Sequence, residues 1–235
     1  MSKIVTIHQP NYLPWIGLFS KIVLSDCLII YDIAQYTSNS VINRNKIRTN
    51  NGFCYLTIPI EKKYYTLRIK DVPLPENRKW QEEHWKTIYQ NYARAPYFKY
   101  HAEFFAQLYK TDFKYLWQIN EKILLYLLES FDIKVEILKA SELNIDSSLR
   151  KTDMLIACLK CAGTDVYLSG PSGKNYLEYE KFSQNQISLK FFKFNHPVYK
   201  QRYPGFESNL SAIDLLFNLG PEATIIIKNA GVIEA

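Results

Sequence analysis

The sequence predicts an α/β protein with a mostly parallel, Rossmann-like sheet in three layers, as a single domain over residues 1–235 with a helical insertion at about residues 76–131. Two observations predict this class. Short apolar runs of strand length alternate with segments of helical periodicity in the first and last thirds of the chain, and three helical segments follow one another in the middle. With 47% hydrophobic residues, the 235 residues can bury such a core without disulfides or metal.

The first third of the chain is expected to contain four strands and one helix. The strand candidates are short runs rich in β-branched or aromatic residues, and the helix is the amphipathic segment after the first of them. A polar stretch rich in Asn and Ser separates the second strand from the third, at residues 32–52. The strands are expected at residues 3–8, 27–31, 53–60 and 66–72, and the helix at residues 15–25.

The middle of the chain is expected to be helical, and the alternation returns after it. Pro96 separates the first two of these helices, and Thr111 is the candidate N-cap of the third. The three helices are expected at residues 78–92, 97–109 and 112–131. In the remainder, strands are expected at residues 133–138, 165–168 and 187–194, and helices at 147–161, from near 174, at 209–219 and at 221–229.

The charge balance sets limits on partners and location. The chain has 29 Lys and Arg against 23 Asp and Glu, and its net charge of +6 suits acidic ligands but is weaker than that of a dedicated nucleic-acid binder. No apolar run approaches the roughly 18–20 residues of a membrane helix. The first residues lack the features of a signal peptide and look like a strand. We therefore expect a cytoplasmic protein that has no membrane span and does not bind nucleic acid.

The four cysteines do not predict a metal site. Cys158 and Cys161 form a C-x-x-C pair, but no second pair or nearby His completes a zinc-binding set. The pair lies within an expected helix, where buried thiols are ordinary, and a redox pair is the less favoured alternative. The sequence therefore requires no metal and no cofactor.

The first candidate site is the segment that follows the first strand. His8 stands at the end of that strand, and ligands of open α/β sheets bind outside the carboxyl ends of strands. An imidazole there can act as a general base or bind phosphate, and the amides of Gln9 and Asn11 offer donors to a polar ligand. Pro10 and Pro14 would keep the loop rigid. The alternative is a turn in which His8 only caps the strand.

The second candidate site is a basic loop at residues 39–49. Arg44, Lys46 and Arg48 alternate with other residues, so they project to one side if the segment is extended. Such a row can bind phosphates or carboxylates through charge-assisted hydrogen bonds, with Asn43 beside it. The alternative is a solvated surface loop.

The third candidate site is a glycine turn at residues 168–176, where a strand ends and a helix is expected. Ser169, Gly170 and Gly173 belong to this turn, which can hold an anion with backbone N–H groups, and Lys174 adds a charge. The segment is not a Walker A loop, and a tight structural turn fits it as well. Another strand end carries His196, which is the better second histidine candidate.

Several blocks of the sequence resemble one known family. The run His8-Gln9-Pro10-Asn11-Tyr12-Leu13-Pro14-Trp15, with Gly17, Phe19 and Lys21, is similar to the opening signature of the WbqC-like family. Later blocks that resemble it include Asn43-Arg44-Asn45-Lys46-Ile47, Leu168-Ser169-Gly170-Pro171 with Tyr176, His196-Pro197-Val198-Tyr199 and Asn209-Leu210-Ser211. Genes of this family typically lie in bacterial surface-polysaccharide clusters. The resemblance therefore implies a biosynthetic role in the cytoplasm, on nucleotide-linked or amino sugars.

The segment after the second strand departs from the family pattern. Members usually carry a paired acid there, whereas this chain keeps Asp32 and has Ile33 in the second position. Asp32 alone can orient His8 or anchor the amine of a ligand, and the alternative is capping of a turn. The candidate catalytic residues are therefore His8 and Asp32. The candidate ligand-binding residues are Gln9, Asn11, Tyr12, Asn43, Arg44, Lys46, Ser169, Gly170, Gly173, Tyr176, His196 and Tyr199.

Three functions are compatible with these residues. The working hypothesis is a transferase that moves an acyl or aminoacyl group from a thioester donor, including one on an acyl carrier protein, onto an amine of a small phosphorylated substrate such as a sugar nucleotide. The second is a nucleotidylyltransferase-like enzyme acting on a sugar phosphate, although the second His of its motif is missing. The third is a sugar- or nucleotide-binding accessory protein without turnover.

Overall fold

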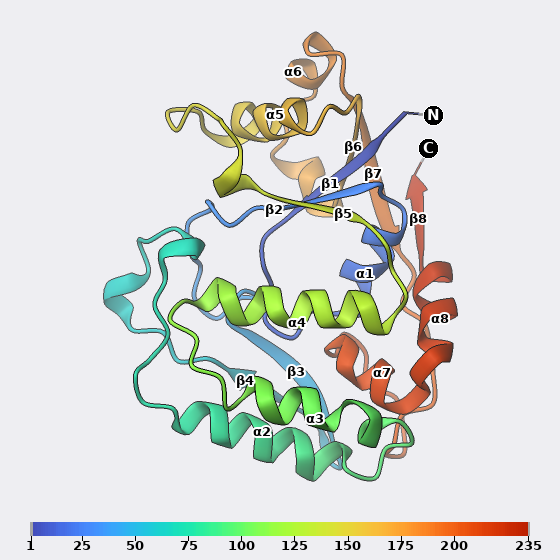
Figure 1. Cartoon of the computed structure of the whole chain (residues 1–235). Helices are drawn as coiled ribbons and strands as arrows, with labels where there is room; N and C mark the ends of the chain where they lie inside the picture. The colour runs from blue at the N-terminus through green and yellow to red at the C-terminus, as the bar shows by residue number, and fades with distance from the viewer. Residues whose placement is uncertain (1, 235) are drawn as a thin grey trace.

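A six-stranded sheet forms the centre of the computed structural model, which describes residues 2–234 (Figure 1). Its strand order is β5-β2-β1-β6-β7-β8, and all neighbours are parallel except β7 and β8. The predicted α/β class and mostly parallel, Rossmann-like sheet are thus confirmed. The strands are β1 (Ile4–His8), β2 (Cys27–Ile30), β5 (Glu136–Lys139), β6 (Val166–Ser169), β7 (Ser188–Phe194) and β8 (Gly231–Glu234).

The direction of strand addition reverses at β1. From β1 the chain moves outward through β2 to β5, and it then returns to the other side of β1 with β6 and continues to β7. In open parallel sheets, ligands bind in the crevice that such a switch point creates at the carboxyl ends of the strands. His8 ends β1 and Ser169 ends β6, so both residues stand at this crevice.

Helices cover both faces of the sheet and make three layers (Figure 1). The sequence of β2 is a continuous apolar run because both faces of the strand are buried. Leu28 and Ile30 pack with α1 and α4, whereas Cys27 and Ile29 pack with α5 on the other face. The helices are α1 (Ile16–Val23), α2 (Lys79–Tyr92), α3 (Phe98–Leu108), α4 (Leu116–Ser130), α5 (Lys151–Cys161), α6 (Tyr179–Gln184), α7 (Ala212–Leu219) and α8 (Ala223–Asn229).

A separate two-stranded hairpin lies beside α2 and α3 (Figure 1). It consists of β3 (Arg44–Thr49) and β4 (Gly52–Thr57), paired antiparallel. The prediction of a loop over residues 39–49 is therefore wrong for residues 44–49. The basic side chains of this segment are held on a strand because Asn45 and Ile47, which alternate with them, are buried.

The strand predicted at residues 66–72 is also wrong. Residues Ile69–Asp71 form a 3-10 turn, and the amides of Ile69 and Lys70 donate to the carbonyls of Ala34 and Asp32, each at 2.9 Å. Ile69 and Val72 are fully buried. The apolar pattern therefore reflects two side chains buried beneath a turn, and these residues belong to no ladder of a sheet.

The remaining differences are shifted element ends and one missed strand. Where a helix is expected from near residue 174, the chain forms the 3-10 segment Pro171–Asn175, and α6 begins at Tyr179. Helix α4 begins at Leu116, and Tyr115 is its N-cap, because the side chain of Gln118 accepts the Tyr115 amide at 2.9 Å in a capping box. Thr111, the predicted cap, instead bonds back to the Gln107 carbonyl at the end of α3. The short antiparallel strand β8 was not predicted. Among residues 2–234, no helix is long and apolar enough to cross a membrane.

Candidate functional site

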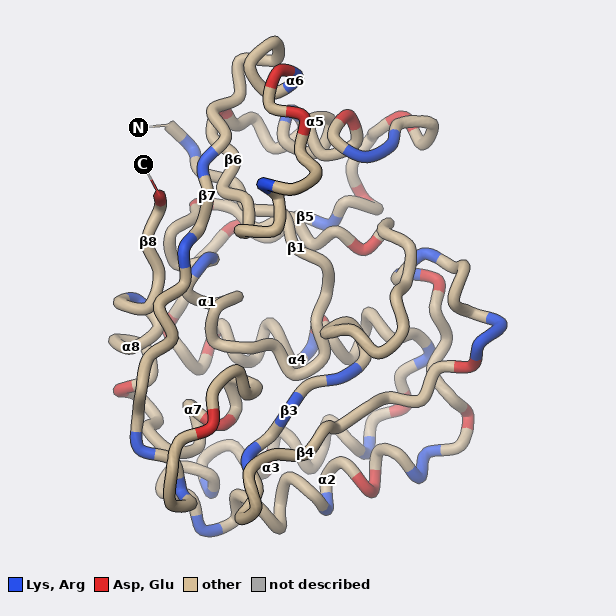
Figure 2. The backbone as a smooth tube through the Cα atoms, turned by 180° about the vertical axis from the view of Figure 1, so that it is seen from behind, with Lys and Arg blue, Asp and Glu red and all other residues tan. Residues whose placement is uncertain are grey.

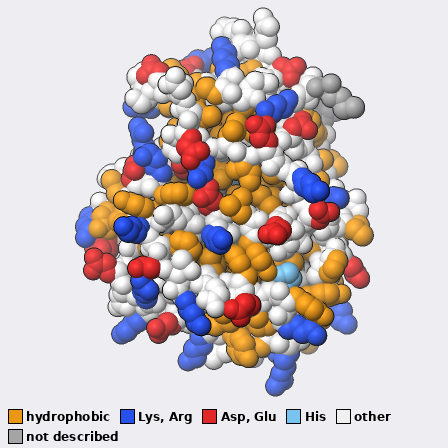
Figure 3. Space-filling model, viewed as in Figure 1, with side chains coloured by type: hydrophobic (Ala, Val, Ile, Leu, Met, Phe, Trp, Pro, Cys, Tyr) orange, Lys and Arg blue, Asp and Glu red, His pale blue; other side chains and the backbone are white. Residues whose placement is uncertain are grey.

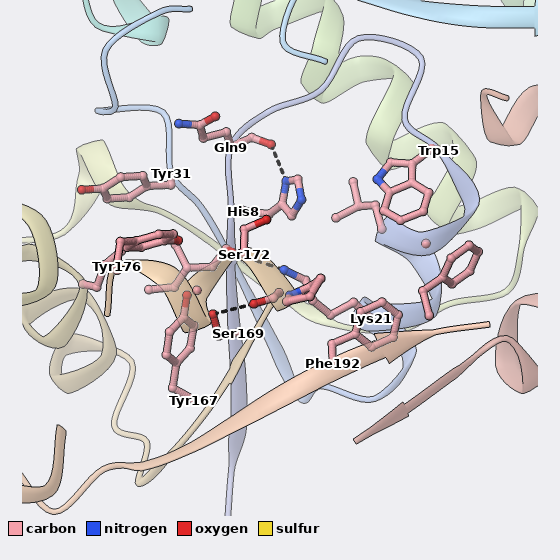
Figure 4. Close-up of a pocket in the computed structure, with 18 of the residues that line it drawn as sticks. His8, Gln9, Trp15, Lys21, Tyr31, Tyr167, Ser169, Ser172, Tyr176 and Phe192 are labelled. Atoms are coloured by element: carbon pink, nitrogen blue, oxygen red, sulfur yellow. Dashed lines mark hydrogen bonds between the residues drawn. The ribbon is translucent and has the colours of Figure 1, made fainter. Parts of the chain in front are cut away.

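A pocket of about 490 Å³ opens at the switch point of the sheet. The carboxyl ends of β1, β2 and β6 form its floor, and α1, the 3-10 segment Pro171–Asn175 and β7 form its walls (Figure 4). The strand ends are fixed to one another because the Tyr31 amide donates to the His8 carbonyl at 2.8 Å. The predicted site residues that line this pocket are His8, Gln9, Ser169, Gly170, Gly173 and Tyr176.

The imidazole of His8 projects into the middle of the pocket, with Trp15 on one side and Tyr31 and Tyr176 on the other (Figure 4). Its Nδ1 lies 2.9 Å from the backbone oxygen of Gln9. A carbonyl only accepts, so Nδ1 carries the hydrogen and Nε2 of the neutral ring keeps its lone pair. Burial, and then the nearby charge of Lys21, lower the pKa of His8 to about 3. His8 is therefore neutral near pH 7 and presents Nε2 as an acceptor.

Lys21, on α1, is a candidate site residue to which sequence reasoning assigned no role. Its side chain lines the pocket although the residue is only 4% exposed. Nζ is 3.4 Å from the Ile7 carbonyl, and no carboxylate among residues 2–234 forms an ion pair with it. Burial lowers the pKa of Lys21 to about 7. The sequence signal for it was a lysine within the apolar segment Ile16–Val23 of an amphipathic helix.

The glycine turn forms one wall of the pocket. A Cβ on Gly173 would lie 2.2 Å from Ser169 Oγ and 2.8 Å from Leu177 Cδ1, so only glycine fits there. The Gly173 amide donates to the Gly170 carbonyl at 3.0 Å, which closes the turn and leaves this N–H unavailable to an anion. Lys174 pairs with Glu234 at the surface and does not line the pocket. The turn therefore determines the shape of the pocket and contributes no charged side chain to its lining.

Aromatic rings make up most of the remaining wall. Trp15 packs edge-on against Phe194, with ring centroids 4.9 Å apart, and Phe192 lies beside them on β7 (Figure 4). Gly17 is needed for this arrangement, because a Cβ there would lie 2.2 Å from the Trp15 ring. Such a wall suits the apolar face of a sugar, a base or an acyl chain. Tyr31, Phe192 and Phe194 were not among the predicted site residues.

Arg44 and Lys46 line a different pocket, of about 370 Å³, which shares Trp15 with the first. The guanidinium of Arg44 lies 4.0 Å from the centroid of the Tyr55 ring, and Lys46 Nζ lies 4.6 Å from that of Phe53. Arg48 does not join them, because it is buried and donates to the carbonyls of Thr49, Gly52 and Pro204. Arg48 thus stabilises the turn of the hairpin and links it to the segment that carries Pro204.

Three other predicted ligand-binding residues lie in the interior, and they line neither the pocket around His8 nor the pocket with Arg44 and Lys46. The Tyr12 hydroxyl is 2.7 Å from His84 Nδ1 and 2.5 Å from the Tyr109 hydroxyl. Asn43 donates to the Ile58 carbonyl at 2.9 Å. Asn11 is 2% exposed, and its amide has no hydrogen-bond partner among residues 2–234. The structure therefore separates these residues from His8.

The segment with His196 and Tyr199 also lies apart from the pocket. Both ring nitrogens of His196 are engaged, Nδ1 with the Pro197 carbonyl and Nε2 as acceptor of the Asn209 amide, each at 2.9 Å. The Tyr199 hydroxyl donates to the buried carboxylate of Asp214 at 2.7 Å. These contacts hold the segment against α7 and the residues before it. The polar side chains of His196 and Tyr199 therefore have structural hydrogen-bond partners.

Asp32 follows β2 but turns away from His8. Its carboxylate accepts the backbone amide of Ser141 at 3.0 Å and also the Ser141 hydroxyl, and the residue is 3% exposed. Asp32 does not line the pocket around His8. These bonds hold the turn after β5 in place, which agrees with the alternative role of Asp32 as the cap of a turn. Among residues 2–234, no cluster of three His, Cys, Asp or Glu side chains is arranged to hold a metal ion.

Comparison with family models identifies one family. Residues 9–226 match the model of the WbqC-like protein family. A similar protein is the uncharacterised Rv1507c of Mycobacterium tuberculosis, which is 33% identical over 224 residues that cover 94% of this chain and 96% of the relative. No solved structure matches the chain at a significant level.

Proposed function

We propose that this protein, which belongs to the WbqC-like family, is a biosynthetic transferase that moves an acyl or aminoacyl group onto an amine of a sugar nucleotide. The observation that carries the proposal is the neutral imidazole of His8, whose Nε2 is free to accept a proton inside a pocket at the switch point.

The pocket residues supply the parts that amide formation needs. The amine nitrogen attacks the carbonyl carbon of a thioester, a C–N bond forms, and the C–S bond breaks. His8 Nε2 accepts the proton that the nitrogen loses, and this proton ends on the departing thiol. Gln9 lines the pocket, and rotation of its side chain brings the amide to donate to the oxyanion that develops on the carbonyl. Asn11 does not share this role, because it is buried elsewhere.

Lys21 gives the site a second titrating group. A base works best when its pKa is near the operating pH, and the pKa of Lys21 is about 7 whereas that of His8 is about 3. In the proposed reaction, neutral Lys21 accepts the proton from His8 and, once protonated, gives it to the departing thiolate. The lack of a carboxylate partner among residues 2–234 keeps both states of Lys21 accessible.

Nucleotidyl transfer is the second candidate, and the same lysine favours it. A charged Lys21 beside His8, at the end of the first strand, is suited to neutralising the phosphates of a nucleoside triphosphate. The two reactions consume different substrates, so one experiment separates them.

The test uses the purified protein in two parallel reactions. One contains acyl- or aminoacyl-thioesters with amino-sugar nucleotides, and the other contains nucleoside triphosphates with sugar phosphates. Release of free thiol together with an amide product supports the proposal. Release of pyrophosphate in the second reaction overturns it in favour of nucleotidyl transfer, and ligand binding without either product indicates an accessory protein.

A further inference from the structure

A third pocket, of about 500 Å³, adjoins the pocket around His8. Tyr31 and Lys151 line both pockets, so the two share a boundary. The third pocket lies between the segment after β2, the turn at residues 66–70 and the start of α5. None of the three candidate sites predicted from the sequence falls in it.

The lining of this pocket is cationic. It includes Arg68, Lys70, Arg150 and Lys151, and it contains no Asp or Glu among residues 2–234. Figure 2 shows basic residues at the start of α5, where the last two of these lie. Arg68 and Arg150 both act on the Tyr31 hydroxyl, since their charges oppose the rise of its pKa to about 12 that burial causes. Positive charge is therefore concentrated toward the boundary with the His8 pocket.

Of these four cations, only Lys70 forms an ion pair among residues 2–234, and its partner is Asp71. Two other neighbouring acids pair with cations outside the pocket lining, Glu142 with Lys139 and Asp153 with Lys181. Asp146 accepts the amide and hydroxyl of Ser148 and forms no ion pair with Arg150. Among residues 2–234, Arg68 and Lys151 have no ion pair and no side-chain hydrogen bond, and Arg150 donates only to the carbonyls of Ser147 and Leu149.

We propose that this third pocket binds a phosphate or diphosphate group of the same ligand whose reactive end lies at His8. The identity of the reactive end at His8 rests on the proposed function. The anion site follows from the geometry of the third pocket alone. Guanidinium groups bind phosphate oxygens through paired charge-assisted hydrogen bonds. The pocket with Arg44 and Lys46 is less suited, because those cations already lie over aromatic rings and Lys46 also donates to the Ser208 carbonyl.

Two sources of the phosphate share this chemistry, namely the diphosphate of a sugar nucleotide and the diphosphate of coenzyme A in a thioester donor. The test is isothermal titration calorimetry of the full chain with inorganic pyrophosphate, uridine diphosphate and coenzyme A. The main variant is Arg68→Ala with Arg150→Ala. Both side chains are exposed, so the variant is expected to keep the wild-type melting temperature.

Two further variants complete the comparison. Arg94→Ala with Lys110→Ala removes the same charge from exposed positions that line none of these pockets. Arg44→Ala tests the competing pocket on β3.

The wild type is expected to bind pyrophosphate and at least one of the two larger probes. The Arg68/Arg150 variant is expected to weaken this binding by about tenfold or more, since it loses charge-assisted hydrogen bonds. The control pair is expected to change it less than about twofold. Loss of uridine diphosphate binding alone identifies the acceptor as the source, and loss of coenzyme A binding alone identifies the donor.

Three results would overturn the proposal: no binding of pyrophosphate to the wild type, equal binding by the wild type and the Arg68/Arg150 variant, or a loss confined to Arg44→Ala. His8→Ala is expected to bind inorganic pyrophosphate as the wild type does, because that probe has no reactive end to place at His8. Absence of transferase activity with intact, Arg68-dependent binding would therefore reject the proposed reaction and leave the anion site standing.

Discussion

His8 and Lys21 are neighbours whose surroundings shift their protonation to different extents. The ring of His8 is fixed by its bond to the Gln9 carbonyl, whereas Lys21 Nζ has one long contact to the Ile7 carbonyl. Burial disfavours the charged form of both, and the positive charge of Lys21 adds to the effect on His8. Pairs of bases with separated pKa values are typical of acid–base sites.

Replacing His8 by alanine tests its role as the proton acceptor. We expect turnover in the transfer reaction to fall by about 10²–10⁴-fold, because general base catalysis contributes on that order. The melting temperature is expected to stay close to that of the wild type, since the ring lies in a pocket and its one hydrogen bond is to an adjacent residue. Wild-type turnover in this variant would exclude His8 from the chemistry.

The pH dependence of stability tests the state of Lys21. Its folded-state pKa of about 7 lies below the ordinary value of 10.5, so between these values the unfolded state binds more protons and stability rises with pH. Relative to Lys21→Met, which has no titrating group there, we expect the wild type to gain on the order of 3 kcal/mol between pH 7 and 10. Urea unfolding of both proteins at each pH measures this difference. A difference that does not change with pH would show that Lys21 titrates normally.

At the scale of elements, the pocket depends on how the turn after β6 is closed. Gly173 lies against Ser169 and Leu177, whereas an added Cβ on Gly170 would have no neighbour within 4 Å. The two glycines belong to one turn and neither has a positive φ, so backbone strain does not distinguish them. The two positions differ in the space that is available to an added methyl group, and this difference alone determines how well each tolerates alanine.

Gly173→Ala is therefore expected to destabilise the protein by about 1–3 kcal/mol, in the range that overpacking costs. Gly170→Ala is the matched control, and we expect its free energy of unfolding to change by less than about 0.5 kcal/mol. Chemical denaturation of the two variants provides both values. Equal stabilities would show that the turn can relax around Ser169.

Elements with strong periodicity were predictable from the sequence, and the contacts between distant elements were not. The run from Cys27 to Ile30 is apolar on both faces, and this predicts a buried parallel strand. The hairpin was missed although Asn50-Asn51-Gly52 is a turn sequence in which Gly52 adopts a φ of 108°, because the polar composition of residues 39–49 indicated a loop. His8 and the glycine turn were found at strand ends, but Asn11 and Tyr12 pack inward beside them, and no local pattern distinguishes the two directions.

At the scale of the whole molecule, the charge is divided into small areas. On the face shown in Figure 3, basic and acidic side chains are interspersed, and the net charge is +6. Some cations are occupied within the structure, as Arg48 is by backbone carbonyls. Two pockets of the size of a small molecule each gather several cations, Arg68, Lys70, Arg150 and Lys151 in one and Arg44 and Lys46 in the other.

This distribution predicts weak binding to nucleic acid. A continuous basic surface gives non-specific dissociation constants of about 10⁻⁴–10⁻⁶ M at physiological salt. We expect the affinity for duplex DNA or single-stranded RNA to be weaker than about 10⁻⁴ M under the same conditions. Fluorescence anisotropy with labelled oligonucleotides measures it, and saturable binding in the micromolar range would contradict this interpretation of the charge.

The strand order also determines when the site can exist during folding. His8 is among the first residues to be synthesised, yet its strand pairs with β6, where Val5 lies opposite Tyr167, and its pocket is closed by Phe194 on β7. Such contacts between distant parts of a chain form slowly and require most of the chain to be present. A nascent or truncated chain that lacks β6 and β7 would display His8 at an open sheet edge, without a pocket. Ligand binding is therefore a reporter of complete folding, as well as of the chemistry at His8.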